Sequence, residues 1–232
     1  MKAVLFDLDG TLLPMDQNEF TSAYFKALAE HTARYGYDPQ KLAGGVWKST
    51  VAMLKNDGSD VNENVFWRSF SDIFGQKVYD DKYIFDEFYS TGFERLKELC
   101  GTNDGMIKVV QGLASRADLV IASNPVFPRV AQAARMRWAG LDDRMFKHIT
   151  SYENSHYCKP KEGYYKEILD SLGYAAEDCV MVGNDVSDDM PARNIGMRVF
   201  LLTDCLINGD NTDISELPHG GSSELEEFLE SV

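Results

Sequence analysis

The sequence contains few cysteines and no paired cysteine motif. The four cysteines are Cys100, Cys158, Cys179 and Cys205, and no two of them lie within three residues of each other. This spacing gives neither a C-x-x-C redox motif nor a cysteine zinc site. It is typical of reduced thiols in a cytosolic protein, so we expect a cytoplasmic location.

Long hydrophobic runs and an excess of basic residues are also missing. No stretch approaches the ~20 apolar residues of a membrane span. The apolar run before Asp7 is too short for the core of a secretion signal. The 23 Lys and Arg residues face 37 Asp and Glu, giving a formal net charge of −14, which disfavours binding to a nucleic acid backbone. We therefore expect no nucleic acid and no membrane partner, whereas a small anionic substrate is compatible with a few local cations.

The chain does contain short apolar runs that end in polar, turn-forming residues. These runs are Ala3–Phe6, Leu119–Ala122, Val180–Val182 and Val199–Leu202. Such runs are typical of strands buried on both faces. Segments with apolar residues at helical spacing lie between them, for example Met106–Leu113 and Tyr164–Leu172. The alternation predicts an α/β fold with a doubly wound parallel sheet, in which ligands bind beyond the carboxyl ends of the strands.

One connection is too long for this fold. Asp7 and Ser123 are 116 positions apart, whereas a parallel crossover needs only about a dozen residues. The excess contains helix-like segments at Glu19–Tyr35, Val46–Leu54 and Tyr83–Leu99. We predict an inserted helical domain over residues 15–98 and an α/β core formed by residues 1–14 and 99–232.

Smaller features of these domains can also be interpreted. Gly44–Trp47 is interpreted as a turn that joins two helices, with a packed tryptophan, and the alternative is a loop of the inserted domain that faces the functional site. Phe66, Trp67 and Phe70 are expected in the core of the inserted domain. Asn208–Ser223 is rich in Gly, Asn, Asp and Ser, and it is expected to be a surface loop.

The first strand end carries two acidic residues, Asp7 and Asp9, followed by Gly10 and Thr11. A carboxylate can act as a nucleophile that splits a displacement into two easier steps. A second carboxylate can protonate the leaving oxygen and later deprotonate water. Gly10 lets the chain turn, and the Thr11 hydroxyl can hold that turn. An ordinary strand-to-turn junction has the same pattern, so the other strand ends must decide its meaning.

Two further segments carry groups that can hold a phosphoryl oxygen. Ser123 and Asn124 follow the second strand, where side chains and backbone N–H groups at a helix start can bind an anion. Lys159 precedes Pro160, which we interpret as a helix start, and a fixed ammonium there can neutralise charge on a transferring phosphoryl group. Taken singly, a capping sequence and a solvated lysine are the simpler interpretations.

The last motif, Gly183–Asp189, is rich in side-chain oxygens. It suits Mg²⁺, which takes one or two protein carboxylates together with waters and substrate oxygens. The alternative is an acidic helix start that is stabilised by the helix dipole. A nucleophile, an acid/base, a lysine and a metal site are together the parts that phosphoryl transfer requires.

This combination resembles the haloacid dehalogenase (HAD) superfamily, in its phosphatase branch. The matching segments are DLDGT at 7–11, Ser123 after LVIA, Lys159 before Pro160, and VGNDVSDD at 182–189. The insertion at 15–98 is similar to the helical cap of that family. The resemblance implies that Asp7 is the nucleophile and a Mg²⁺ ligand. Asp9 would be the acid/base and offer its backbone carbonyl to Mg²⁺.

The resemblance also implies the groups that hold the substrate. Ser123 and Lys159 would bind the phosphoryl group, and we expect Thr11 and Asn124 to add contacts to it. The family usually has an Asp directly after the glycine of the last motif, where this chain has Asn184 and then Asp185. A count back from Asp189 without a gap puts Asn184 in the metal position. We favour Asp185 with Asp189, because a carboxylate holds Mg²⁺ better than an amide.

We expect Mg²⁺-dependent hydrolysis of a small phosphorylated metabolite through an aspartyl-phosphate. A haloacid dehalogenase is disfavoured by Asp9, because a halide leaving group needs no proton. A phosphosugar mutase or another phosphotransferase would keep the same core residues. A HAD-like binding protein that has lost catalysis is the alternative to which Asn184 points. A phosphonate hydrolase would need a cap lysine, for which Lys48 and Lys55 are the candidates, each more simply a solvated residue. We further expect the cap to close over the site and exclude water.

Overall fold

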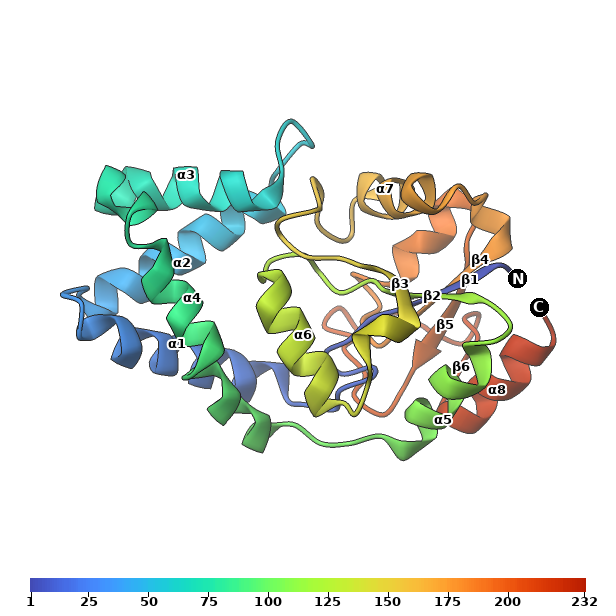
Figure 1. Ribbon diagram of the computed structural model, residues 1–232. Coiled ribbons are helices and arrows are strands. Elements are labelled where there is room, and N and C mark those ends of the chain that lie inside the picture. Colours follow the sequence, from blue (N-terminus) through green and yellow to red (C-terminus); the bar gives the residue numbers. More distant parts are fainter.

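Six parallel strands form one sheet in the order β3-β2-β1-β4-β5-β6 (Figure 1). The computed structural model describes residues 1–232. The strands are β1 (Ala3–Phe6), β2 (Asp118–Ile121), β3 (Phe146–Ile149), β4 (Cys179–Gly183), β5 (Arg198–Leu202) and β6 (His219–Gly220). β1 pairs with β2 on one side and β4 on the other, with Phe6 opposite both Ile121 and Val182. This register aligns the carboxyl ends of the three central strands.

Both faces of the sheet are covered, which explains why the central strands are continuously apolar. Val4 and Phe6 of β1 pack in one hydrophobic cluster, whereas Ala3 and Leu5 pack in the other. The first cluster includes residues of α5 (Asp104–Leu113), α6 (Arg129–Trp138) and α8 (Ser222–Glu230). The second includes residues of α7 (Glu162–Leu172) and the short helix η5 (Met190–Ile195). The expected doubly wound α/β architecture is therefore confirmed.

Two short helices, η3 (Asp143–Met145) and η4 (Ala176–Asp178), directly precede β3 and β4. The other six helices lie beside the sheet, on the side toward which β1 runs from the N-terminus (Figure 1). They are α1 (Gln17–Ala33), α2 (Pro39–Leu54), α3 (Asn62–Phe74), η1 (Gln76–Tyr79), α4 (Lys82–Ser90) and η2 (Phe93–Leu99). The chain leaves and returns at one place, because Met15 bridges Cys100 and the Gly101 N–H donates to the Pro14 carbonyl at 2.7 Å. We use the name cap for residues 15–98, the boundary that the sequence predicts. None of the helices is both long and apolar enough to span a membrane.

Local sequence signals define the ends of the cap helices. The Asp16 side chain accepts hydrogen bonds from the N–H groups of Asn18 and Glu19, both at 2.9 Å, and so caps α1. Asp38 caps α2, and Pro39 occupies its first turn. Gly75 ends α3 with a φ of 82°. The Asp16 and Asp38 caps satisfy N–H groups in the first turns of α1 and α2 that would otherwise lack partners.

The interior of the cap is built from aromatic rings. Phe66 stacks on Phe70 with centroids 5.5 Å apart, and Trp67 meets Phe85 edge-on at 5.3 Å. Phe70 is fully buried. The expectation that Phe66, Trp67 and Phe70 form the cap core is confirmed. Edge-to-face aromatic pairs of this kind add to the free energy that their burial contributes.

The structure corrects four local predictions. Gly44–Trp47 lies inside α2 and is not a turn, and Trp47 is 55% exposed rather than packed. A Cβ at Gly45 would lie 2.5 Å from the Phe74 ring, so glycine here permits close packing of α2 against α3. The predicted helix Tyr83–Leu99 is broken between α4 and η2. Helix α7 begins at Glu162 and not at Pro160.

The fourth correction concerns the edges of the sheet. The sequence predicted neither β3 nor β6, and β6 lies within the segment Asn208–Ser223 that was expected to be a loop. β3 and β6 are the two edge strands, so each pairs on one side only. In β3 the exposed Lys147 and half-buried His148 interrupt the apolar run. β6 has only two residues, too few for a periodic pattern.

Candidate active site

The carboxyl ends of the strands meet at a cavity of about 410 Å³. The predicted site residues that line it are Asp7, Asp9, Ser123, Asn124, Lys159, Asn184, Asp185 and Asp189. Backbone hydrogen bonds between the strand ends fix the loops after β1, β2 and β4 relative to one another. The Asp7 N–H donates to the Val182 carbonyl at 2.9 Å, and the Ala122 N–H donates to the Phe6 carbonyl at 2.7 Å. Residues from four separate parts of the sequence thus share one cavity.

Lys159 lies at the centre of a buried charge network. Its Nζ donates to Asp7 Oδ1 at 2.8 Å and to Asp189 Oδ1 at 2.6 Å. The Lys159 side chain is only 1% exposed, so it is not the solvated lysine that its isolated motif would indicate. Burial lowers the pKa of Lys159, but Asp189 and Asp7 more than offset this and raise the pKa well above its ordinary value. The site therefore holds a fixed positive charge beside Asp7.

Asp9 lies in a different environment. Its Oδ2 forms an ion pair with Nη1 of Arg135, and its Oδ1 is buried without a hydrogen-bond partner. Burial raises the pKa of Asp9, Arg135 lowers it, and Asp7 raises it again, with a net rise. A carboxyl group with a raised pKa keeps its proton at a higher pH, as a proton donor requires.

Sequence analysis missed Arg135. Its guanidinium lies over the Phe127 ring, with Cζ 4.4 Å from the centroid, and Nη2 donates to Gln132 Oε1 at 2.5 Å. One signal could have indicated it, because Arg135 follows Ala131 by four positions and therefore lies on the apolar face of α6. A charged side chain on such a face requires a buried partner. Asp9 is that partner.

Thr11 and Asn184 support the loop that carries Asp7. The Thr11 hydroxyl lies 3.0 Å from Asn184 Oδ1 and 3.3 Å from Asp7 Oδ2. Asn184 Nδ2 donates to the Cys205 carbonyl at 2.7 Å. Gly10 has a φ of 84°, and a Cβ there would lie 2.3 Å from Asn184 Nδ2. Thr11 is fully buried and does not line the cavity. Contrary to the expectation of a substrate contact, its geometry suits positioning of Asp7.

The acidic residues of the last motif differ in how their oxygens are used. Asp185 Oδ1 accepts from the N–H groups of Ser187 at 2.7 Å and Asp188 at 3.0 Å, and no protein donor reaches its Oδ2. Asp189 uses both oxygens, Oδ1 for Lys159 and Oδ2 for the Asp185 N–H at 2.9 Å. Of these two predicted metal ligands, only Asp185 has an oxygen that no protein group engages.

Asp188 also lines the cavity, although it was not a predicted site residue. Its Oδ2 accepts from Asn124 Nδ2 at 3.2 Å. Burial raises the pKa of Asp188, and Lys159 lowers it by a smaller amount. The pair links the loop after β2 to the loop after β4, and it leaves Asn124 Oδ1 buried without a partner.

The donor set fits a magnesium ion. No three acidic, histidine or cysteine side chains lie close enough to hold a metal by themselves. Mg²⁺ does not need three, because waters and substrate oxygens usually complete its six ligands. Asp7 and Asp185 line the same cavity, and Asp9 Oδ1 and Asn124 Oδ1 are buried acceptors without a partner there. Buried acceptors of this kind are ordinarily satisfied by bound water or an ion.

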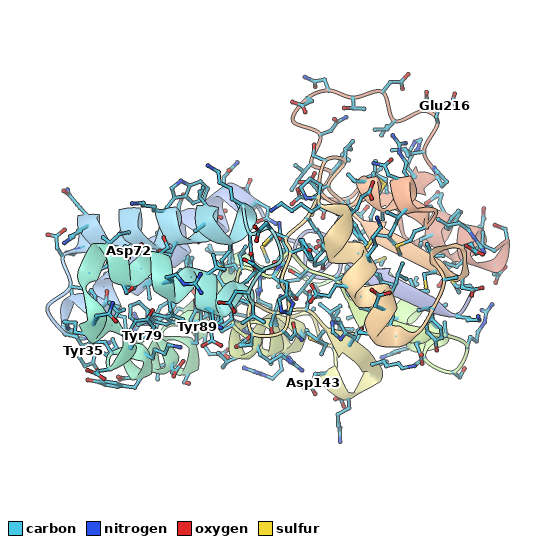
Figure 2. All side chains as sticks on the ribbon, turned by 90° about the horizontal axis from the view of Figure 1, so that it is seen from above. Tyr35, Asp72, Tyr79, Tyr89, Asp143 and Glu216 are labelled. Atoms are coloured by element: carbon cyan, nitrogen blue, oxygen red, sulfur yellow. The ribbon has the colours of Figure 1, made fainter.

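The cap covers this end of the sheet. The first turn of α3 is bound to the core through the Asn62 N–H, which donates to the Ser155 carbonyl at 2.9 Å, and the Glu63 N–H, which donates to the Tyr152 carbonyl at 2.7 Å. Tyr89 of α4 lines the cavity and lies on the part of the cap near the core, whereas Tyr35 and Tyr79 lie at the far end (Figure 2). The cap is therefore in contact with the core around the cavity.

Solved structures share this architecture. A 2-haloacid dehalogenase from Pseudomonas syringae pv. Tomato has a TM-score of 0.65 and 22% identity, covering 100% of this chain and 99% of its own. A HAD phosphatase from Thermococcus onnurineus has a TM-score of 0.58 and 20% identity, covering 99% and 98%. A HAD hydrolase from Bacillus subtilis, described as bound to magnesium, has a TM-score of 0.56 and 19% identity, covering 98% of each chain. At these identities the likeness shows the fold.

The family comparison carries more weight for identity. No curated protein matches the sequence. The model of the haloacid dehalogenase-like hydrolases matches residues 1–196, which include the loops that carry Asp7, Ser123, Lys159 and Asp185. That range covers most of the chain and reaches through η5. The chain therefore belongs to the haloacid dehalogenase-like hydrolases.

Proposed function

We propose that this hydrolase cleaves small phosphomonoesters with Mg²⁺ and that Asp7 carries the phosphoryl group in an intermediate. The observation that carries the proposal is the pair of unlike carboxyl groups. Asp7 is held by the buried ammonium of Lys159, whereas Asp9, two positions later, pairs with Arg135 through one oxygen and keeps its Oδ1 without a partner. A carboxylate nucleophile next to a second carboxyl group that can give and take a proton is the pair that phosphoester cleavage with a poor leaving group needs.

In the first half-reaction an oxygen of Asp7 attacks phosphorus while the ester P–O bond breaks. Asp9 gives its proton to the leaving oxygen, so an alcohol and an aspartyl-phosphate are formed. In the second half-reaction Asp9, now a carboxylate, takes a proton from water as the water attacks phosphorus. The Asp7–phosphate bond breaks, phosphate leaves, and both carboxyl groups return to their starting states.

The remaining groups orient the phosphoryl group and neutralise its charge. Lys159 supplies a fixed cation, and Ser123 is held because its carbonyl accepts from Thr150 Oγ1 at 2.7 Å and from the Tyr164 hydroxyl at 3.0 Å. Asp7, Asp185 and the Asp9 carbonyl would hold Mg²⁺, which supplies Lewis-acid stabilisation of the phosphoryl charge. Asp189 holds Lys159 in place through the 2.6 Å contact. Charge stabilisation by prearranged groups is the largest part of such catalysis.

Asp9 also separates this proposal from dehalogenation, which a structural neighbour performs by its description. A halide leaves without a proton, so a dehalogenase has no use for a carboxyl group of raised pKa. A phosphotransferase that passes the group to a second alcohol would use the same residues, with that alcohol in place of water.

The test is release of phosphate from p-nitrophenyl phosphate and from alkyl phosphates, with Mg²⁺ and after its removal by EDTA. We expect turnover that needs Mg²⁺ and that Asp7→Asn abolishes. Asp72→Asn, at an exposed position on α3, is the matched control and should retain full activity. Chloride release from 2-chloropropionate is measured in parallel. Chloride release without phosphate release, or no metal-dependent turnover of any ester, would refute the proposal.

A further inference from the structure

The cap contributes mainly aromatic and aliphatic side chains to the cavity. All four long cap helices take part, through Phe20 and Phe25 of α1, Trp47 of α2, Phe66 and Trp67 of α3, and Phe85 of α4. The core contributes the carboxylates, Lys159 and Arg135 described above. The cavity therefore has two chemically different linings, and a phosphomonoester bound at Asp7 would present its alcohol part to the cap.

The charges in the cavity disfavour a second anionic group on that alcohol. The lining contains six carboxylates and only two basic side chains, Arg135 and Lys159. Both basic groups lie on the core, and both are already paired, with Asp9 and with Asp7 and Asp189 respectively. Among the cap residues of the lining, Asp86 is the only charged one. A carboxylate or a second phosphate facing the cap would be buried without a counter-ion, at a large cost.

Apolar side chains outnumber polar ones in the cap lining, where nine residues are apolar and the polar ones besides two tyrosines are Gln17, Thr21, Thr50 and Asp86. The Tyr24 and Tyr89 hydroxyls bond to each other at 2.9 Å. Burial raises the pKa of Tyr24 to about 12, so this side chain stays neutral. A sugar or polyol buried here would face mainly apolar side chains, and each hydroxyl left without a hydrogen bond would be unfavourable. A volume of about 410 Å³ is within the range of small-molecule sites.

We propose that the substrate is the phosphate monoester of a neutral, largely apolar alcohol, aryl or alkyl, whose carbon skeleton packs on the cap aromatics. The inference rests on the proposed phosphatase function, since it names the leaving group of that reaction. Selectivity comes from apolar burial against Phe25, Trp47 and Phe66. It comes equally from the absence of any free cation for an anionic leaving group.

The first experiment measures kcat/KM with Mg²⁺ for ethyl, butyl and hexyl phosphate. Their leaving alcohols are of similar basicity, so differences report contacts with the cap. We expect kcat/KM to rise about fourfold for each added methylene, as burial of apolar surface predicts. Two polar esters are each compared with an alkyl phosphate that has the same number of carbon atoms. We expect 2-phosphoglycolate to be at least about tenfold poorer than ethyl phosphate and glycerol 3-phosphate similarly poorer than propyl phosphate, because their polar groups lack partners.

A pair of cap variants assigns this preference to the cavity. Trp47 is 55% exposed and lines the cavity, whereas Tyr83 is 58% exposed and does not. Trp47→Ala should reduce the ratio of kcat/KM for hexyl over ethyl phosphate, and Tyr83→Ala should leave it unchanged. Both positions are exposed, so neither change should unfold the cap. An unchanged ratio in Trp47→Ala, or an equal fall in both variants, counts against the proposal.

Binding of phosphonates tests the apolar site separately from the phosphatase activity. A phosphonate has a C–P bond in place of the ester bond, so the proposed reaction does not cleave it. With Mg²⁺ present, calorimetry should show hexylphosphonate binding at least about tenfold more tightly than phosphonoacetate. Turnover of esters with a preference for phosphoglycolate or sugar phosphates would overturn the apolar leaving group and leave the phosphatase standing. Preferential binding of hexylphosphonate without turnover of any ester would overturn the phosphatase and leave the apolar site. If neither ester turnover nor phosphonate binding favours the apolar compounds, the inference is overturned.

Discussion

Arg135 and Asp9 form an ion pair whose side chains are 1% and 14% exposed. The two residues are 126 positions apart, and the pair joins α6 to the loop after β1. Burial raises the pKa of Asp9 and Arg135 lowers it, so the arginine limits how strongly the carboxyl holds its proton. An acid that must later act as a base needs this balance, because a proton held too tightly blocks the second half-reaction.

Replacing Arg135 by Gln should therefore raise the pKa of Asp9 further. The carboxylate form needed to activate water would then appear only at higher pH. The acidic limb of the kcat profile should move to higher pH, so that kcat falls more in acid than in alkali. The measurement is kcat with p-nitrophenyl phosphate from about pH 5 to about pH 9. Arg135→Lys keeps a cation and should shift the limb less.

The free energy of unfolding of the same variants shows whether a change in kcat arises from unfolding of the protein. Removing one partner of a buried ion pair costs about 3 kcal/mol of the free energy of unfolding. Arg137, on the same helix, pairs with Glu94 at the surface, where the side chains are 60% and 43% exposed. Arg137→Gln should cost under ~1 kcal/mol and leave the pH profile unchanged. If the pH profile of kcat for Arg135→Gln matches that of the wild type, Arg135 does not control the pKa of Asp9.

Asp9→Asn should separate leaving groups by their need for a proton. p-Nitrophenolate leaves unaided, so Asp7 should still be phosphorylated rapidly and give one burst of product per enzyme, followed by slow turnover. An alkoxide cannot leave unaided, and butyl phosphate should lose about 100-fold or more in rate without any burst. Stopped-flow absorbance and phosphate release measure the two cases. Equal losses on both substrates without a burst would contradict the role of Asp9 as proton donor.

Asp185 and Asn184 should respond differently to Mg²⁺. Asp185 has a carboxylate oxygen that no protein group engages, so Asp185→Ala should raise the Mg²⁺ concentration for half-maximal activity by about tenfold or more. Asn184 binds Thr11 and the Cys205 carbonyl, so Asn184→Ala should cost about 1–3 kcal/mol of unfolding free energy. It should leave the Mg²⁺ midpoint near wild type. Mg²⁺ titrations of activity and thermal unfolding check both. The reverse pattern would make Asn184 the ligand.

How far the sequence could predict this site depends on where each residue lies. Asp7 and Ser123 follow strands with clear sequence signals, and the pairing of β1 with β2 brings them together. Lys159 lies between β3, which the sequence did not reveal, and α7, so its place in the cavity did not follow from the predicted strands. Arg135 is different, because its partner is 126 positions away and no spacing rule connects a helix interior to that loop.

The fold likewise contains elements that the sequence predicts and elements that it does not. β1 is buried on both faces and its four residues are all apolar, so the strand was evident. β3 lies at an edge, where Lys147 is exposed, and its pattern resembles a polar segment. Gly44 and Gly45 suggested a turn, since glycine is poor in helices. Only the approach of Phe74 explains Gly45 in α2, and this contact exists only once α2 and α3 have packed.

Docking of the cap should depend on Gly58, in the loop between α2 and α3. Its φ is 93°, and a Cβ there would lie 2.2 Å from the Tyr157 ring of the core. Gly58→Ala should displace this loop and weaken the contact of the cap with the core. We therefore expect a lower kcat and faster proteolysis of the segments that join the cap to the core. Gly36 has a similar φ of 87° with nothing within 4 Å of an added Cβ, so Gly36→Ala carries the same backbone strain of about 1 kcal/mol without the clash. Equal effects of the two changes on kcat and on proteolysis would show that cap contact with the core is immaterial.

His31 should make the stability of the cap depend on pH. It is buried in α1, where its Nε2 lies 3.0 Å from the Ile84 carbonyl and Nδ1 lies 2.7 Å from Arg34 Nη2. Burial, and then Arg34, lower the pKa of His31 below its ordinary 6.5. The unfolded chain therefore binds a proton at a pH where the folded chain does not, and stability falls as the pH drops below about 6.5. Urea unfolding on both sides of that pH should show a smaller fall for His31→Gln than for wild type. An identical fall in both proteins would exclude His31 as a source of acid sensitivity.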